Sequence, residues 1–192
     1  ILSNLLSVNF SHHLDKWQDE QLDHCFVNGK RTISPSSSGL SMFGAIVVIL
    51  KGQNISPGIY YYCRDNHSLQ ILSNGLKPEI LSHWLMDQYW CKDLSAGLFL
   101  VGDLRRTWSK DKRTRGYITN YLESGHVSQN ILLSATALGL RTWMTGTFRD
   151  ESLCQGLHLA GEPLFPFFFV GLGYGNNQAI PHQFIQYGKE KS

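Results

Sequence analysis

A serine-rich loop directly before an apolar segment is the first stretch of this sequence that could do chemistry. It begins at Arg31 and contains Ser36, Ser37, Ser38 and Gly39. A serine hydroxyl both donates and accepts hydrogen bonds, and glycine lets the backbone approach a ligand closely. On composition alone such a loop is more often a plain connection. The loop is therefore a candidate for holding a polar ligand, with a plain connection as the alternative.

A second candidate stretch is Thr145-Gly146-Thr147, which follows a short predicted strand at Thr142 to Met144. Glycine beside a strand often marks a place where the backbone approaches a ligand or another chain. We therefore expect bare backbone at this turn to face a ligand.

Charge, cysteine and histidine content argue against several classes of protein. The net charge is +2 and no Lys/Arg run dominates, so we predict no nucleic-acid partner. The one basic cluster, Arg105 to Arg115, predicts a solvated loop. Four cysteines without a C-x-x-C pair and eight histidines without ligand spacing predict neither zinc nor disulfides. Without a membrane-length apolar run or a signal peptide, we expect a cytoplasmic protein that does not bind membranes.

The segment Arg115 to Phe148 is the element that must position these groups. Apolar residues recur along it at helical steps: Val127, Ile131, Ala135 and Leu138. Small residues cover much of the remaining surface, so we predict a helix buried on most sides, at a core or subunit interface. Gly139 suits the left-handed residue that ends a helix.

The other elements predict one α+β domain over residues 1–192. A helix end is expected at residues 1–10, a helix opening at Pro78, and a short helix over Glu151 to Leu157, capped by Asp150. Buried strands are expected at Met42 to Leu50, Ile59 to Cys63, Gly97 to Val101 and Leu164 to Leu172. We predict a mostly antiparallel central sheet of about four strands flanked by helices and completed as an intertwined homodimer.

Two motifs give these elements a family resemblance. The run E-S-G-H-x-x-Q-N-(x)4-A-x-A-L-G-L with its T-G-T-F turn resembles the nitroreductase-like flavoproteins. Residues 57–72, PGIYYYCRDNHSLQIL, are similar to a motif of the azoline dehydrogenases, which make thiazoles and oxazoles in peptide natural products. His67 lies at a polar turn of that motif, so we expect a structural role for it.

The resemblance implies an FMN cofactor held between two protomers. In such proteins the S-P-S-S loop and the turn after the central helix contact the flavin, while an N–H of that turn lies beside N5. The residues expected to bind the cofactor here are Arg31, Ser36, Ser37, Ser38, Gly39, Gln129, Asn130, Gly146 and Thr147.

The resemblance also implies a base for the proton that leaves with the hydride. Its position, set by the R-G-Y motif at residues 115–117, points to Lys112, with Tyr117 as the alternative. The Lys-Tyr pair of peptide azoline dehydrogenases is not reproduced. The family's Arg-rich phosphate-binding segment precedes the first helix, and this sequence starts at Ile1. We therefore expect either a missing N-terminal segment or weak or absent flavin binding.

Three functions remain open at this stage. The leading hypothesis is an FMN-dependent dehydrogenase or oxidase that converts thiazoline or oxazoline rings to thiazole or oxazole, on a peptide or carrier-tethered substrate. An NAD(P)H-dependent nitroreductase is the second, and the motif at residues 57–72 argues against it. A flavin-free scaffold subunit of a peptide-modifying complex is the third, favoured by the altered Lys-Tyr pair.

Overall fold

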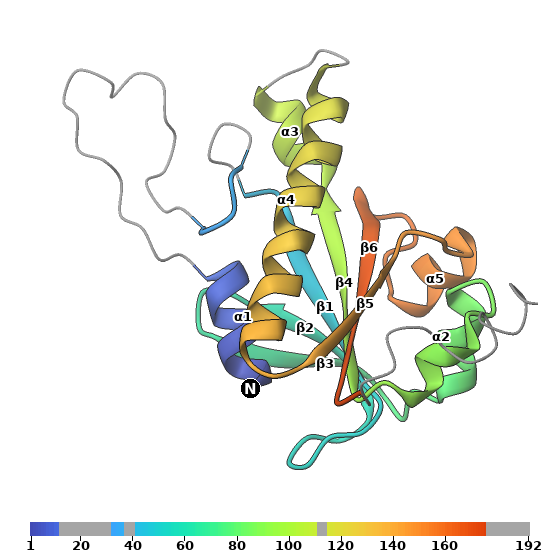
Figure 1. Ribbon diagram of the computed structural model, residues 1–192. Coiled ribbons are helices and arrows are strands. Elements are labelled where there is room, and N and C mark those ends of the chain that lie inside the picture. Colours follow the sequence, from blue (N-terminus) through green and yellow to red (C-terminus); the bar gives the residue numbers. More distant parts are fainter. Residues whose placement is uncertain (12–31, 37–40, 111–114, 176–192) are drawn as a thin grey trace, which may run out of the picture.

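The structure is a computed structural model that describes residues 1–11, 32–36, 41–110 and 115–175. In chain order the elements alternate between short helices and strands (Figure 1). The helices are α1 (Leu2–Phe10), α2 (Pro78–Trp84), the 3-10 helix η2 (Tyr89–Asp93), α3 (Leu104–Lys110), α4 (Arg115–Ala137) and α5 (Asp150–Gly156). The strands are β1 (Phe43–Ile49), β2 (Gly58–Cys63), β3 (Ser68–Asn74), β4 (Ala96–Asp103), β5 (Arg141–Thr145) and β6 (Leu164–Gly173).

The strands form one sheet in the order β3-β2-β1-β4-β6-β5, and every neighbouring pair is antiparallel. The α+β, antiparallel prediction is confirmed, but the expected count of about four strands was too low. The two outermost strands, β3 and β5, contain no fully buried residue. Edge strands of this kind lack the apolar run by which the central strands could be recognised.

Each face of the sheet carries its own core. On one face α1 and α4 pack against Ala45, Val47 and Ile49 of β1. On the other face α2 and α5 pack against Ile46 and Val48 of the same strand. The alternation follows from the two-residue period of a strand, and Figure 1 shows the helices on the two sides of the sheet.

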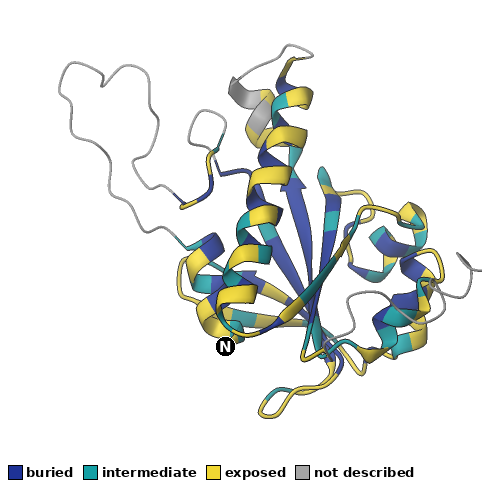
Figure 2. Ribbon diagram, viewed as in Figure 1, coloured by how far each residue is buried: buried dark blue, intermediate teal, exposed yellow. Residues whose placement is uncertain are grey.

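The central helix α4 is buried along one face, not on most sides. Val127, Ile131 and Ala135 are buried against the sheet as predicted, and Leu138 is partly buried beside them. Gly139 has φ of +78°, which confirms the left-handed helix end. The opposite face exposes an apolar stripe within the single chain (Figure 2). We call Ile118, Tyr121, Leu122 and Leu133 the exposed stripe.

Three local predictions differ from the structure. Helix α2 ends at Trp84, and Ile80 and Tyr89 are exposed, so the apolar face is narrower than expected. Asp150 is the first residue of α5 and Arg149 holds the cap position. The basic cluster was predicted as a loop, yet its first half forms α3, because local composition does not report the packing of α3 against α4.

Two searches of the described ranges returned nothing. No helix there is long and apolar enough to cross a membrane. No group of three or more His, Cys, Asp or Glu side chains in the same ranges is placed to hold a metal ion.

Candidate functional site

The loop before β1 is fastened to α4 by the amide of Asn130. Its Nδ2 donates to Ser34 Oγ at 2.9 Å, and Ser34 is buried. The Asn130 carbonyl accepts from Ser134 Oγ one turn further along α4. Asn130 therefore positions the predicted ligand loop from within the chain.

Ser36 closes the base of the same loop. Its Oγ accepts a hydrogen bond from the backbone N–H of Ser41 at 2.7 Å. Ser36 and Ser41 flank residues 37–40, so this bond sets how the chain leaves and re-enters the described structure. Ser37, Ser38 and Gly39, like Arg31, lie outside the described residues, and their predicted contacts stay predictions.

Gln129 lies beside Asn130 in sequence but on the opposite face of α4. It is exposed, and it falls four residues before Leu133 of the exposed stripe. Residues spaced by four share a helix face. Gln129 is therefore placed to meet a ligand or partner chain that covers this face.

The turn after β5 presents backbone as the sequence predicts. The Thr147 N–H donates to Thr145 Oγ1 at 3.2 Å, whereas the Gly146 N–H has no hydrogen-bond partner among the described residues. A Cβ on Gly146 would meet the Phe168 ring at 3.3 Å. The absence of a side chain thus lets the turn lie close to β6, with one amide left for a ligand.

Gln88 holds this turn, and sequence reasoning did not find it. Its Nε2 lies within hydrogen-bond distance of Leu85 O at 2.7 Å, Thr145 Oγ1 at 3.2 Å and Thr147 O at 3.4 Å. A single glutamine after a helix has no sequence pattern that predicts such contacts. Only the fold brings residue 88 to the end of β5.

A second brace joins the same two segments. Both guanidinium nitrogens of Arg149 bind the carboxylate of Asp87, at 3.0 and 2.6 Å. This pairing lowers the pKa of Asp87 and raises that of Arg149, chiefly through the hydrogen bonds between their side chains. The Arg149 backbone N–H also donates to the Trp84 carbonyl at 2.8 Å. The turn is therefore attached to the segment after α2 by side chains and backbone alike.

The two parts of the predicted site are not brought together within one chain. Figure 1 shows the described part of the loop before β1 on one side of α4, while β5 carries the turn toward α5 on the other. Lys112 lies outside the described residues. Tyr117 stands in the first turn of α4 and is 52% exposed.

Comparisons with known proteins agree with this fold. The sequence model of the nitroreductase family matches residues 14–174. A candidate nitroreductase of Methanocaldococcus jannaschii is 31% identical over 111 residues, which cover 57% of this chain and 55% of that protein. The chain thus spans about half of the length of this curated relative.

Two solved structures share the fold at low sequence identity. A candidate nitroreductase from Anabaena variabilis superimposes with a TM-score of 0.77 at 22% identity, covering 89% of this chain and 34% of that one. The E. coli microcin synthetase McbBCD complex, solved with truncated pro-MccB17 bound, gives a TM-score of 0.71 at 20% identity, covering 92% and 63%. With the family model matching most of its length, this chain belongs to the nitroreductase family.

Proposed function

We propose that this protein is an FMN-dependent oxidoreductase that oxidises thiazoline or oxazoline rings to thiazole or oxazole in a peptide natural product. The observation that carries the proposal is the motif at residues 57–72, which resembles that of azoline dehydrogenases. The fold likeness to the microcin synthetase complex is in keeping with a peptide substrate, although at 20% identity it speaks for the fold alone.

In the structure this motif forms the β2–β3 hairpin and fixes it to α1. Tyr62 Oη lies 2.7 Å from His67 Nδ1, and His67 Nε2 lies 2.7 Å from Ser3 Oγ. His67 has φ of 49°, a conformation that non-glycine residues adopt rarely. The structural role predicted for His67 is confirmed, so the motif supports the function through the shape of this end of the sheet.

The described residues fit a flavin cofactor. The Gly146 amide is left without a described partner, and the loop before β1 is held in place by Asn130. Gln129 stands on an exposed face that a second protomer would cover. FMN, when bound, would accept the hydride that leaves the azoline ring. The Gly146 N–H would donate to the flavin ring, and Ser36 and Asn130 would keep the serine loop ready for the partner's cofactor.

A base of this chain must take the proton that leaves the ring with the hydride. Lys112 is our candidate, and Tyr117 is the alternative. Arg113 and Arg115 flank Lys112 in sequence, and neighbouring positive charges favour the neutral amine that a lysine base needs. Dioxygen is the final electron acceptor in this proposal, which gives one hydrogen peroxide for each ring oxidised.

A second function is favoured by the relative from M. jannaschii, which is named as a candidate nitroreductase. In that case NAD(P)H would reduce the flavin, and a nitroaromatic compound or quinone would reoxidise it. The two functions differ in what reduces the flavin, an azoline ring or a nicotinamide.

One set of measurements separates these functions. The absorption spectrum of the purified protein should show flavin bands in the blue and near-ultraviolet; a protein that stays colourless after FMN is added would refute both. Under anaerobic conditions a thiazoline-containing peptide should bleach the flavin and lose two hydrogen atoms by mass spectrometry. The matched thiazole peptide is the control. Rapid bleaching by NADH and none by the thiazoline peptide would favour the nitroreductase.

A further inference from the structure

A pocket of about 340 Å³ opens on the sheet face that carries α5, away from α4. Its apolar wall comes from three strands and from the chain after α5, namely Gly44, Ile46, Leu72, Val101, Leu157 and Leu159. We call it the sheet pocket. No residue of the turn at 145–147 lines it, so it is distinct from the candidate flavin-binding turn.

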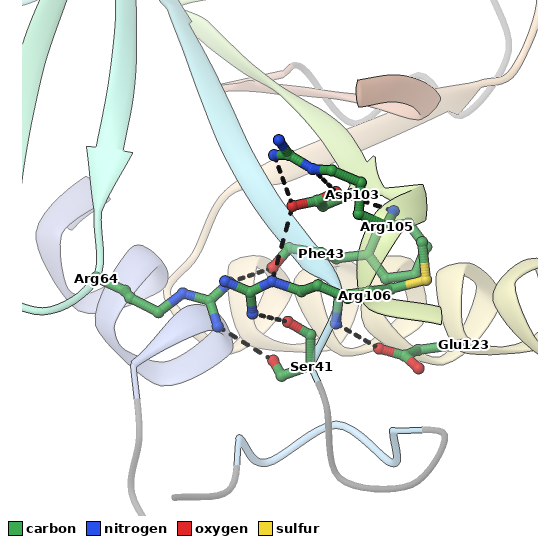
Figure 3. A network of polar contacts seen from close by, with 8 residues as sticks. Ser41, Phe43, Arg64, Asp103, Arg105, Arg106 and Glu123 are labelled. Carbon is green, nitrogen blue, oxygen red and sulfur yellow. Dashed lines mark hydrogen bonds and ion pairs between the residues drawn. The ribbon is translucent and has the colours of Figure 1, made fainter. Parts of the chain in front are cut away.

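Three arginines surround one side of the sheet pocket (Figure 3). Arg64 donates to Ser41 Oγ at 3.3 Å and to the Phe43 carbonyl. Arg106 donates to the Ser41 carbonyl at 3.2 Å. Burial lowers the pKa of Arg64, and the nearby Arg106 charge lowers it further. Two guanidinium groups are therefore held close to each other on one short backbone segment.

The third arginine, Arg105, is paired with Asp103. Its Nε and Nη2 bind the two carboxylate oxygens at 2.9 and 3.0 Å. Burial alone would raise the pKa of Asp103, but the hydrogen bonds from Arg105 dominate and lower it. Asp103 is the one carboxylate among the described residues that line the pocket. Three positive charges against one negative charge leave the lining with a net charge of +2.

The floor of the pocket has space because β1 carries glycine at position 44. A Cβ built on Gly44 meets no atom within 4 Å, although the residue pairs with Val101 in the middle of the sheet. The neighbouring inward positions on this face hold bulky side chains such as Ile46 and Val48. Gly44 thus keeps open a volume that an ordinary β-strand residue would fill.

We propose that the sheet pocket binds a small organic anion, with an aliphatic chain against the sheet and a carboxylate or phosphate head against Arg105 and Arg106. The volume lies in the range of pockets that enclose small ligands. Guanidinium groups form strong, charge-assisted hydrogen bonds with both head groups. Such a ligand offsets the two uncompensated positive charges and covers apolar surface. The proposal does not depend on the flavin or on the reaction.

Hexanoate and 1-hexanol are a matched pair of probes, because they share a chain and differ in charge. Titration calorimetry uses protein saturated with FMN, so that a probe cannot enter through an empty flavin site. Hexanoate should bind at least tenfold more tightly than 1-hexanol. Equal binding of the two probes would overturn the proposal.

Variants locate the binding. Gly44→Leu should fill the floor and weaken hexanoate binding at least tenfold. Arg105→Gln, at an exposed side chain, should weaken it roughly tenfold, because a charge-assisted hydrogen bond is lost. Lys51→Gln is the control, since Lys51 is an exposed cation that does not line the pocket. If Gly44→Leu does not fold, Arg105→Gln against Lys51→Gln decides. Hexanoate binding unchanged in Arg105→Gln, or equally weakened in Lys51→Gln, would overturn the proposal.

Discussion

Gln88 Nε2 donates to Thr145 Oγ1 across 3.2 Å, and this contact joins residues 57 positions apart in sequence. The segment that Gln88 ends is unusual, because Met86 and Asp87 both have positive φ, 56° and 58°. Backbone in this region is costly for non-glycine residues and persists only where surrounding contacts hold it. Gln88 and the Asp87–Arg149 pair supply those contacts, and in return they fix the turn that offers the Gly146 amide.

Gln88→Ala should weaken FMN binding roughly tenfold. The change removes the hydrogen bonds that hold the turn, and one such bond contributes about 1 kcal/mol. FMN titration by fluorescence measures the effect. Gln70→Ala, on the exposed strand β3, is the control and should change nothing. Unaltered FMN affinity in Gln88→Ala would show that the turn does not bear on the flavin.

Ser36→Ala combined with Ser38→Ala should weaken FMN binding by roughly ten- to a hundredfold, at about 1 kcal/mol per hydrogen bond lost. The structure adds a reason for Ser36, because its Oγ accepts the Ser41 N–H at the base of the loop. The single variants separate the two effects. An FMN titration curve for the double variant that overlays the wild-type curve would reject the loop as a flavin contact.

Leu122→Glu should give a monomer that has lost its flavin. Leu122 is 57% exposed in the single chain and belongs to the exposed stripe, which we expect a second copy to cover. Sedimentation velocity measures the assembly. Ile71→Glu is the control, an equally conservative change of an exposed apolar residue on β3. A wild-type protein that sediments as a stable monomer would contradict the homodimer.

Ala135→Glu should instead abolish folding of the single chain. Ala135 is 0% exposed and packs against the sheet, so a charge there would be buried without a partner. Soluble expression and circular dichroism check this outcome. A folded, soluble Ala135→Glu variant would show that α4 does not pack against the sheet as described.

Lys112→Gln should abolish azoline oxidation while the flavin remains bound and reducible by dithionite. A base in hydrogen-bond reach contributes about a hundredfold or more to the rate. Lys110→Gln, two residues earlier, should do little. Equal losses in both variants would indicate substrate attraction by the basic cluster, and no loss in either would transfer the role to Tyr117.

The Asp87–Arg149 pair should make stability depend on pH in acid. The pKa of Asp87 is lowered in the folded protein, so its contribution is complete above the unfolded value of about 4. The contribution is lost as pH falls through the folded value. The thermal midpoint of wild type should therefore exceed that of Asp87→Asn near pH 6, by a small margin because Asp87 is exposed, and the two should converge in strong acid. A gap that persists there would contradict the pairing.

The sequence by itself determined the central elements of this protein. Periodicity located α4 and its buried residues Val127, Ile131 and Ala135, because one helix face must meet the sheet. Apolar runs located β1, β4 and β6, whose residues are buried from both sides. The family motifs indicated the nitroreductase fold because they mark local turns and helix ends, such as Gly139, that depend on few neighbours.

Only the tertiary structure decided which distant groups meet. Gln88 and Thr145, or Asn130 and Ser34, come together through packing that no local pattern encodes. The sheet pocket has the same origin, since Gly44 and the three arginines come from separate strands and from α3. The edge strands β3 and β5 escaped prediction for a related reason. Their positions are fixed by hydrogen bonds to β2 and β6, which any sequence can form, and not by buried side chains.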